Sequence, residues 1–161
     1  MKLGLASAAV LAAGGGAIAL IEPGLRDARL TPAGQLVFTH VGRGMLQGSL
    51  PAGAERDAAL ASMLVRIDAL VASLPPHAQT ELSQLLALLA SGAGRRAVAG
   101  LASPWETAEV DEIQRALQGM RVASVSLRQQ AYHALHDITL SAYFSDPSTW
   151  SVLGYPGPPK V

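Results

Sequence analysis

Apolar side chains recur along residues 60–74 at steps of three and four, which places them on one side of a helix. The stripe is formed by Leu60, Met63, Leu64, Ile67, Leu70, Val71 and Leu74. Pro75-Pro76 ends it, because proline cannot continue the hydrogen-bond ladder of a helix. A second stripe follows at once and ends near Gly92 and Gly94; it is formed by Leu82, Leu85, Leu86 and Leu89. Helices joined by so few residues are expected to be antiparallel neighbours.

Helix-start signals predict further helices on both sides of this pair. Thr31-Pro32 matches an N-cap followed by proline at the first helical position, and apolar residues continue at helical spacing to Met45. The run Ser-Pro-Trp-Glu at residues 103–106 predicts another start, with the serine as cap and the glutamate reaching back to the cap N–H. Residues 121–144 predict one long helix or a pair of helices, apolar on many sides and therefore central.

No alternating strand pattern and no Asn-Gly or Asp-Gly hairpin signal is present in the sequence. The predicted fold is therefore all-α. We expect an irregular bundle of about five to six helices after an N-terminal signal or anchor segment, with an extended C-terminal tail rich in glycine, proline and aromatic residues. The parts are an export signal or anchor at 1–21, a linker at 22–30, a helical domain at 31–145 and the tail at 146–161.

Residues 1–21 differ from the rest of the chain. Lys2 is the only charge before Glu22, and the apolar stretch between them ends in small residues, as in an export signal. An uncleaved membrane anchor is the alternative, since 19 uncharged residues just span a bilayer. The abundance of glycine and alanine makes the stretch only mildly apolar, which favours the export signal.

Composition excludes several classes of function. Half of the residues are hydrophobic, 15% are charged, and the mean hydropathy is +0.29. The formal net charge is zero, so a charge-driven interaction with nucleic acid is not expected. The chain has no cysteine, which excludes disulfides, thiolate metal sites and a cysteine nucleophile.

Candidate chemistry is sparse. His133, His136 and Asp137 lie three and four residues apart and can share a helix face, which makes them weak candidates for a metal site. The repeated Glu-x-x-His pattern of helical-bundle metal sites is missing. The sequence also lacks a Gly-x-Ser-x-Gly elbow and a Ser-x-x-Lys motif, and we interpret Arg95-Arg96 as a solvated pair. We therefore predict no catalytic and no cofactor-binding residues in this chain.

Aromatic residues, only 4% of the chain, gather near its C-terminus. Gly and Pro around them exclude regular helix over residues 156–159. The tail either covers the end of the bundle or docks onto another protein, since aromatic side chains are good anchors, and the two roles are compatible. The predicted partner-binding residues are Tyr143, Phe144, Trp150, Leu153, Tyr155, Pro156 and Pro158.

The tail resembles the C-terminal signature of the gluconate 2-dehydrogenase subunit 3 family, small subunits that accompany FAD-dependent dehydrogenases of the glucose-methanol-choline type. The matching residues are Tyr143, Phe144, Ser145, Pro147, Trp150, Leu153, Gly154, Tyr155, Pro156, Gly157 and Pro158. The Leu30-Thr31-Pro32 start, leading to Leu50-Pro51, resembles the start of that family. The leader resembles the end of a twin-arginine signal. Its arginine pair is missing, so the pair is encoded upstream of Met1 or the likeness is coincidental.

This resemblance implies a non-catalytic subunit that binds, helps to export or mature, and stabilises a flavin-dependent dehydrogenase outside the cytoplasm. FAD then belongs to the partner, and a cytochrome c subunit often passes the electrons on. The expected location is periplasmic or exported, with membrane contact only through an uncleaved leader. The alternative from another class is a stand-alone periplasmic helical binding protein, or a small metalloprotein that uses His133 and His136. A membrane-anchored structural protein is a third interpretation.

Overall fold

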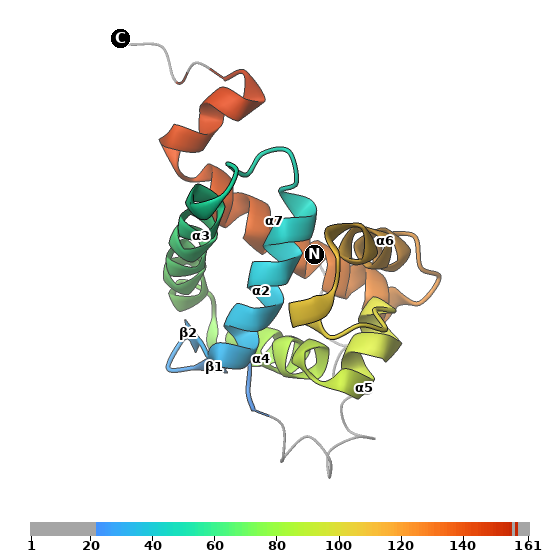
Figure 1. Ribbon diagram of the computed structural model, residues 1–161. Coiled ribbons are helices and arrows are strands. Elements are labelled where there is room, and N and C mark those ends of the chain that lie inside the picture. The colour runs from blue at the N-terminus through green and yellow to red at the C-terminus, as the bar shows by residue number, and fades with distance from the viewer. Residues whose placement is uncertain (1–21, 156, 158–161) are drawn as a thin grey trace.

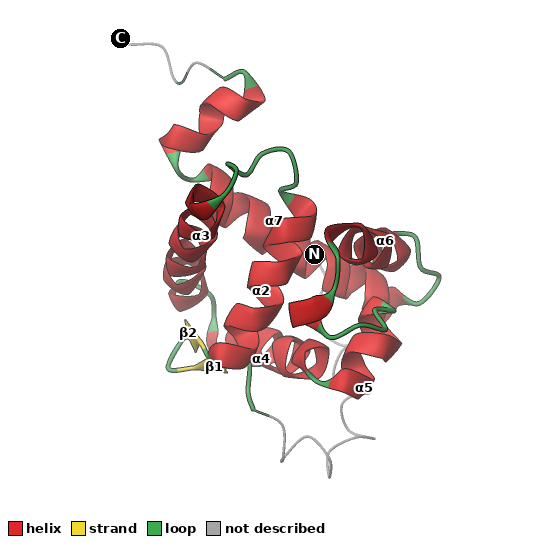
Figure 2. Ribbon diagram, in the orientation of Figure 1, coloured by secondary structure: helices red, strands yellow, loops and turns green. Residues whose placement is uncertain are grey.

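Helices α3 (Ala54–Ala72) and α4 (Pro76–Ala90) form where the two leucine-rich stripes predict them, and Pro76 is the first residue of α4. The computed structural model describes residues 22–155 and 157, and these form the predicted irregular all-α bundle (Figure 1; Figure 2). The predicted side-by-side packing of α3 and α4 is wrong. The two helices cross at an angle, and each packs instead on α2 (Pro32–Met45).

Helix α2 is the centre of the bundle. It begins at the predicted N-cap, where the Thr31 hydroxyl accepts from the Gly34 N–H, and it contacts α3, α4, α6 (Val110–Arg121) and α7 (Ser126–Phe144). Its neighbours come close because two of its positions are glycine. A Cβ on Gly42 would lie 2.9 Å from Met63 Cε, and a Cβ on Gly44 would lie 2.6 Å from Ile113 Cγ2.

Residues 22–30, predicted as a linker, belong to the folded body. Strands β1 (Leu25–Arg26) and β2 (Arg29–Leu30) form a small antiparallel hairpin, although the sequence predicted no strand. The turn residues Asp27 and Ala28 both have positive φ, as in the primed turns that suit hairpins. The two strand leucines are buried, and their N–H groups donate to Ser83 Oγ (3.0 Å) and Asp68 Oδ1 (2.8 Å). Burial of this apolar pair and these bonds to α3 and α4 explain why the segment is ordered.

The predicted helix start at residues 103–106 also needs correction. That run forms only a short 3-10 turn, η3 (Trp105–Thr107), and α6 begins later, with Glu109 and Glu112 as a reciprocal capping box. The turn is held by Trp105, which is 1% exposed and donates from its indole N–H to the Leu89 carbonyl (2.8 Å). Burial of the tryptophan therefore overrides the capping signal of the serine.

Before η3 the chain passes through α5 (Gly92–Gly94) and the π-helical turn η2 (Arg95–Ala99). Arg95, predicted to be solvated, is only 6% exposed. Its guanidinium donates to the Leu101 and Ala102 carbonyls, both at 3.3 Å, while Arg96 is exposed. Arg95 thus holds the loop that follows the π-helical turn, because it donates hydrogen bonds to two carbonyl groups that need partners inside the protein.

No helix of the described part of the chain is both long enough and apolar enough to span a membrane. The predicted export signal or anchor at residues 1–21 lies outside the described residues. The predicted helical segment at 121–144 corresponds to the end of α6 and to α7, which packs against α2, α3 and α6.

Candidate functional site

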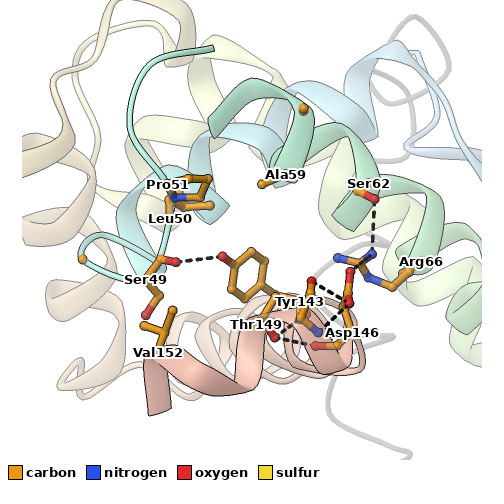
Figure 3. Close-up of a pocket in the computed structure, with 13 residues that line it drawn as sticks. Ser49, Leu50, Pro51, Ala59, Ser62, Arg66, Tyr143, Asp146, Thr149 and Val152 are labelled. Atoms are coloured by element: carbon orange, nitrogen blue, oxygen red, sulfur yellow. Dashed lines mark hydrogen bonds and ion pairs between the residues drawn. The ribbon is translucent and has the colours of Figure 1, made fainter. Parts of the chain in front are cut away.

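The C-terminal aromatic residues divide into a buried and an exposed group. Tyr143, in the last turn of α7, is 3% exposed, and its hydroxyl donates to the Ser49 carbonyl (2.8 Å) in the loop between α2 and α3 (Figure 3). Phe144 is half-buried and meets the Tyr143 ring edge-on. Tyr143, predicted to bind a partner, is therefore a core residue that fastens α7 to that loop and is not available for direct contact.

Beyond α7 the tail forms a 3-10 helix, η4 (Pro147–Leu153), where an extended path was expected over residues 146–161. The first turn of η4 begins at Pro147. Asp146 is the N-cap, and its Oδ1 accepts from the Ser148 N–H (2.9 Å) and the Ser148 hydroxyl (2.8 Å). The hydroxyl of Thr149 donates to the Asp146 carbonyl (2.7 Å). Short polar side chains at an N-cap accept hydrogen bonds in this way from the N–H groups of the first turn, which have no partner within the helix.

Arg66 of α3 ties η4 to the body of the protein. Its Nε donates to the Ala142 carbonyl at the end of α7 (2.6 Å), and its Nη1 lies 3.2 Å from Asp146 Oδ2 (Figure 3). Hydrogen bonds from the Ser148 N–H and hydroxyl, followed by the charge of Arg66, lower the pKa of Asp146. The carboxylate is consequently ionised at neutral pH and can serve both the cap and the ion pair.

Trp150 fixes the distal part of the segment. Its indole N–H donates to the Phe144 carbonyl (2.8 Å), and its ring lies 5.3 Å from the ring of Tyr155, measured between centroids. Gly154 has a φ of +68°, which lets the chain turn back so that the Tyr155 N–H reaches the Trp150 carbonyl (3.1 Å). The tail residues are therefore held in one conformation by their own hydrogen bonds.

Three large apolar side chains stay exposed on this anchored segment, and together they are named the C-terminal face. Its residues are Val152 (50% exposed), Leu153 (58%) and Tyr155 (49%). The segment projects from the body beyond the end of α7, at the top of Figure 1. Pro156 and Pro158, also predicted to bind a partner, lie outside the described residues.

A pocket of about 500 Å³ adjoins the C-terminal face (Figure 3). It lies between the 48–51 loop, the start of α3 and η4, and Val152 is on its rim. The polar groups in it are already engaged: Arg66 with Asp146, and Tyr143 with Ser49. Burial raises the pKa of the Tyr143 hydroxyl, so it stays protonated at neutral pH. These hydrogen bonds and the ion pair hold the tail in place. The pocket beside the tail is lined by both apolar and polar side chains.

Replacing Arg66 with glutamine is expected to loosen η4 and leave the bundle folded. The variant loses the ion pair and the bond to Ala142, so amide hydrogen exchange of residues 148–155 should accelerate several-fold. Lys in place of Arg66 keeps the charge and is the control. Unchanged exchange in the glutamine variant would contradict this role of Arg66.

Asp146 adds a pH dependence to the stability of η4. The pKa of Asp146 is lowered from 3.8, so its support for η4 is complete above pH 3.8 and disappears as pH falls through the lower value.

The weak metal candidates are only partly brought together. His136 Nδ1 lies 2.9 Å from Asp137 Oδ1, whereas His133 is exposed and packs edge-on against Tyr132. Across residues 22–155 and 157, no three His, Asp or Glu side chains are grouped so that they could hold a metal ion. The alternative of a small metalloprotein that uses His133 and His136 therefore gains no support from this geometry.

His40, to which the sequence assigned no role, is a buried titratable group. It is 8% exposed, its Nδ1 accepts from Arg43 Nη1 (3.3 Å), and its ring lies 6.4 Å from that of Trp105. Burial and then the Arg43 charge lower its pKa, against the opposing charge of Glu106. The environment therefore keeps the imidazole neutral.

Because the folded-state pKa of His40 lies below its ordinary value of 6.5, the unfolded chain binds its proton first as pH falls. Stability should accordingly decrease as pH drops below 6.5, down to the lower folded pKa. In the His40→Gln variant, which keeps a hydrogen-bond acceptor for Arg43, this part of the decrease should disappear. Urea unfolding of both proteins above and below pH 6.5 measures it, and identical pH slopes would contradict the assignment.

Comparison with protein-family models, with curated proteins and with solved structures found no match to this chain. The functional interpretation therefore depends on the tail residues and on the geometry described above.

Proposed function

We propose that this chain is a non-catalytic accessory subunit that docks through its C-terminal face onto a flavin-dependent dehydrogenase. The observation that carries the proposal is the C-terminal face itself. Val152, Leu153 and Tyr155 are large apolar side chains, each about half exposed, on a short segment that its own hydrogen bonds hold rigid. Preorganised apolar anchors of this kind are typical of protein interfaces, because little conformational entropy is lost on binding.

The class of partner comes from the resemblance of residues 143–159 to the gluconate 2-dehydrogenase subunit 3 family. It implies a large subunit of the glucose-methanol-choline type that carries FAD, together with export or maturation of that subunit outside the cytoplasm. The leader at residues 1–21, interpreted as an export signal, fits this role. The chain has no cysteine, so electrons would pass through the flavoprotein and a cytochrome c subunit.

Co-expression of the tagged full chain with a flavin-dependent dehydrogenase of the glucose-methanol-choline type from the same genome tests the proposal. We expect the two chains to elute together in size-exclusion chromatography in a fixed ratio, with the absorption spectrum of oxidised flavin in that peak. Separate elution of a folded chain without flavoprotein would overturn the assignment.

A further inference from the structure

A second pocket, of about 340 Å³, lies at the opposite end of α7 from the C-terminal face. It is lined by the loop after the π-helical turn, by α6 and by the first turn of α7. The residues that matter for its chemistry are Gly100, Glu112, Arg115, Gly119 and Arg128. Nothing in the proposed docking function uses this pocket.

Two arginines fix the loop wall of the pocket from opposite sides. Buried Arg95 donates to the Leu101 and Ala102 carbonyls, and Arg128 of α7 donates from Nε to the Val98 carbonyl (2.8 Å). Gly100 has a φ of +71° and makes the turn between these contacts. Three carbonyl groups in and beside this wall, those of Val98, Leu101 and Ala102, are thus already paired with guanidinium groups, so the pocket offers few free acceptors to a ligand.

The donors that face the pocket are in excess. Arg128 uses only its Nε in the hydrogen bond to Val98, and Arg115 uses only its Nε, on the Asp111 carbonyl of its own helix (3.2 Å). The terminal nitrogens of both side chains have no hydrogen-bond partner among the described residues. The described part of the chain contains all 12 acidic side chains of the sequence. None of their carboxylate oxygens lies within 4.0 Å of a guanidinium nitrogen of Arg115 or Arg128, so neither arginine is in an ion pair with them.

Glu112 lines the same pocket without neutralising either arginine. Its Oε1 accepts from the Ser103 hydroxyl (3.1 Å) and its Oε2 from the Glu109 N–H (3.1 Å), so both oxygens serve the start of α6. Two guanidinium groups therefore share a concave site with one carboxylate whose oxygens are occupied. Such a site attracts anions, because concave walls focus the field of like charges.

Glycine keeps the guanidinium of Arg128 accessible. A Cβ on Gly100 would lie 3.1 Å from Arg128 Nη2, and a Cβ on Gly119 would lie 3.8 Å from the same atom. Side chains at these two positions would cover the terminal nitrogens that the pocket exposes. The two glycines come from the loop and from α6, so the opening is made jointly by separate elements.

We propose that this pocket binds a small molecule through an oxyanion group, a carboxylate or a phosphate, held by Arg115 and Arg128. The guanidinium fork is planar and donates two parallel hydrogen bonds, which match either oxyanion. The volume is in the range of sites for small ligands. The oxyanion takes the place of an acidic side chain, because neither arginine forms an ion pair among the described residues.

Titration of the isotope-labelled full chain with inorganic phosphate, and separately with succinate, tests the site at constant ionic strength set with chloride. We expect saturable shifts of the Gly100 and Gly119 amide resonances, and the tighter of the two probes identifies the class of oxyanion. Arg115→Gln should weaken binding about tenfold, the loss of one hydrogen bond between charged groups. The only hydrogen bond of the Arg115 side chain among the described residues is to the backbone of its own helix, so we expect this variant to retain its fold.

The matched control is Arg121→Gln, on the same helix but outside the pocket, where Arg121 bonds only to Gln118. Its affinity for the probe should equal that of the unmodified chain. Arg128→Lys should lower the affinity as well, because lysine keeps the charge and loses the fork. Shifts that do not saturate with either probe, or equal affinities of the Arg115 and Arg121 variants, would overturn the proposal.

Discussion

Replacement of Trp105 with alanine is expected to lower the free energy of unfolding by about 3 to 5 kcal/mol. Trp105 is 1% exposed, and its indole N–H satisfies the Leu89 carbonyl of α4 at 2.8 Å. The alanine variant loses the largest fully buried side chain of the core and leaves that carbonyl without its partner. Urea unfolding monitored by circular dichroism measures the change.

Two further variants separate the contributions. Trp105→Phe keeps most of the apolar volume and loses the N–H donor, so we expect a loss of about 1 to 3 kcal/mol. Val65→Ala, at a position that is 69% exposed on α3, should change stability by no more than about 0.5 kcal/mol. An alanine variant at Trp105 as stable as the Val65 control would contradict the view that η3 is held by burial of this ring.

The second large effect concerns docking. The double variant Leu153→Asp with Tyr155→Ser should weaken binding of the flavoprotein about 30-fold or more while the fold is retained. Both side chains are about half exposed and contribute little to the core, whereas at an interface they would be desolvated, and an aspartate there would be buried without a partner. Titration of the flavoprotein with each form of the chain measures the affinity.

Val125→Asp is the matched control for that experiment. Val125 is 57% exposed, against 58% for Leu153, and receives the same change of charge. It caps the N-terminus of α7, the end opposite to the tail, and α7 is about 28 Å long. Aspartate is favourable at an N-cap, so the control folds. Equal loss of affinity in the control and the double variant would mean that charge, and not the C-terminal face, governs binding.

The long helices could be predicted from the sequence because their signals are local. Thr31-Pro32 begins α2 and Pro75-Pro76 separates α3 from α4, as periodicity and proline chemistry dictate. How these helices pack could not be predicted in the same way. The crossing of α3 and α4 follows from the close approach of both to α2, which depends on contacts between residues far apart in the chain.

Short elements escaped prediction for a different reason. The β1–β2 hairpin has two residues in each strand, too few for alternation to be visible, and its turn is Asp-Ala instead of Asn-Gly. The burial of Arg95 likewise has no sequence signal, because its acceptors are the backbone carbonyls of a loop. Asp27 has a positive φ in this turn, and aspartate is a residue type that tolerates it, but one such residue is too weak a signal to predict a hairpin.

The candidate site was predicted in part. Concentrated aromatic residues located the C-terminal segment, but its 3-10 helix was not predicted. Spacing alone did not separate buried Tyr143 from exposed Tyr155, and Arg66 of α3, some 80 residues away from Asp146, carried no signal of its role. The pocket lined by Arg115 and Arg128 also joins separate helices and became visible only in the fold.

The most direct test of the docking account is hydrogen–deuterium exchange of the chain, free and in complex with the flavoprotein. The account predicts that the complex protects the amides of residues 148–155 and leaves those at the start of α7 unchanged. Residues 148–155 that exchange equally fast in the free and the bound chain, with protection on another face, would contradict it.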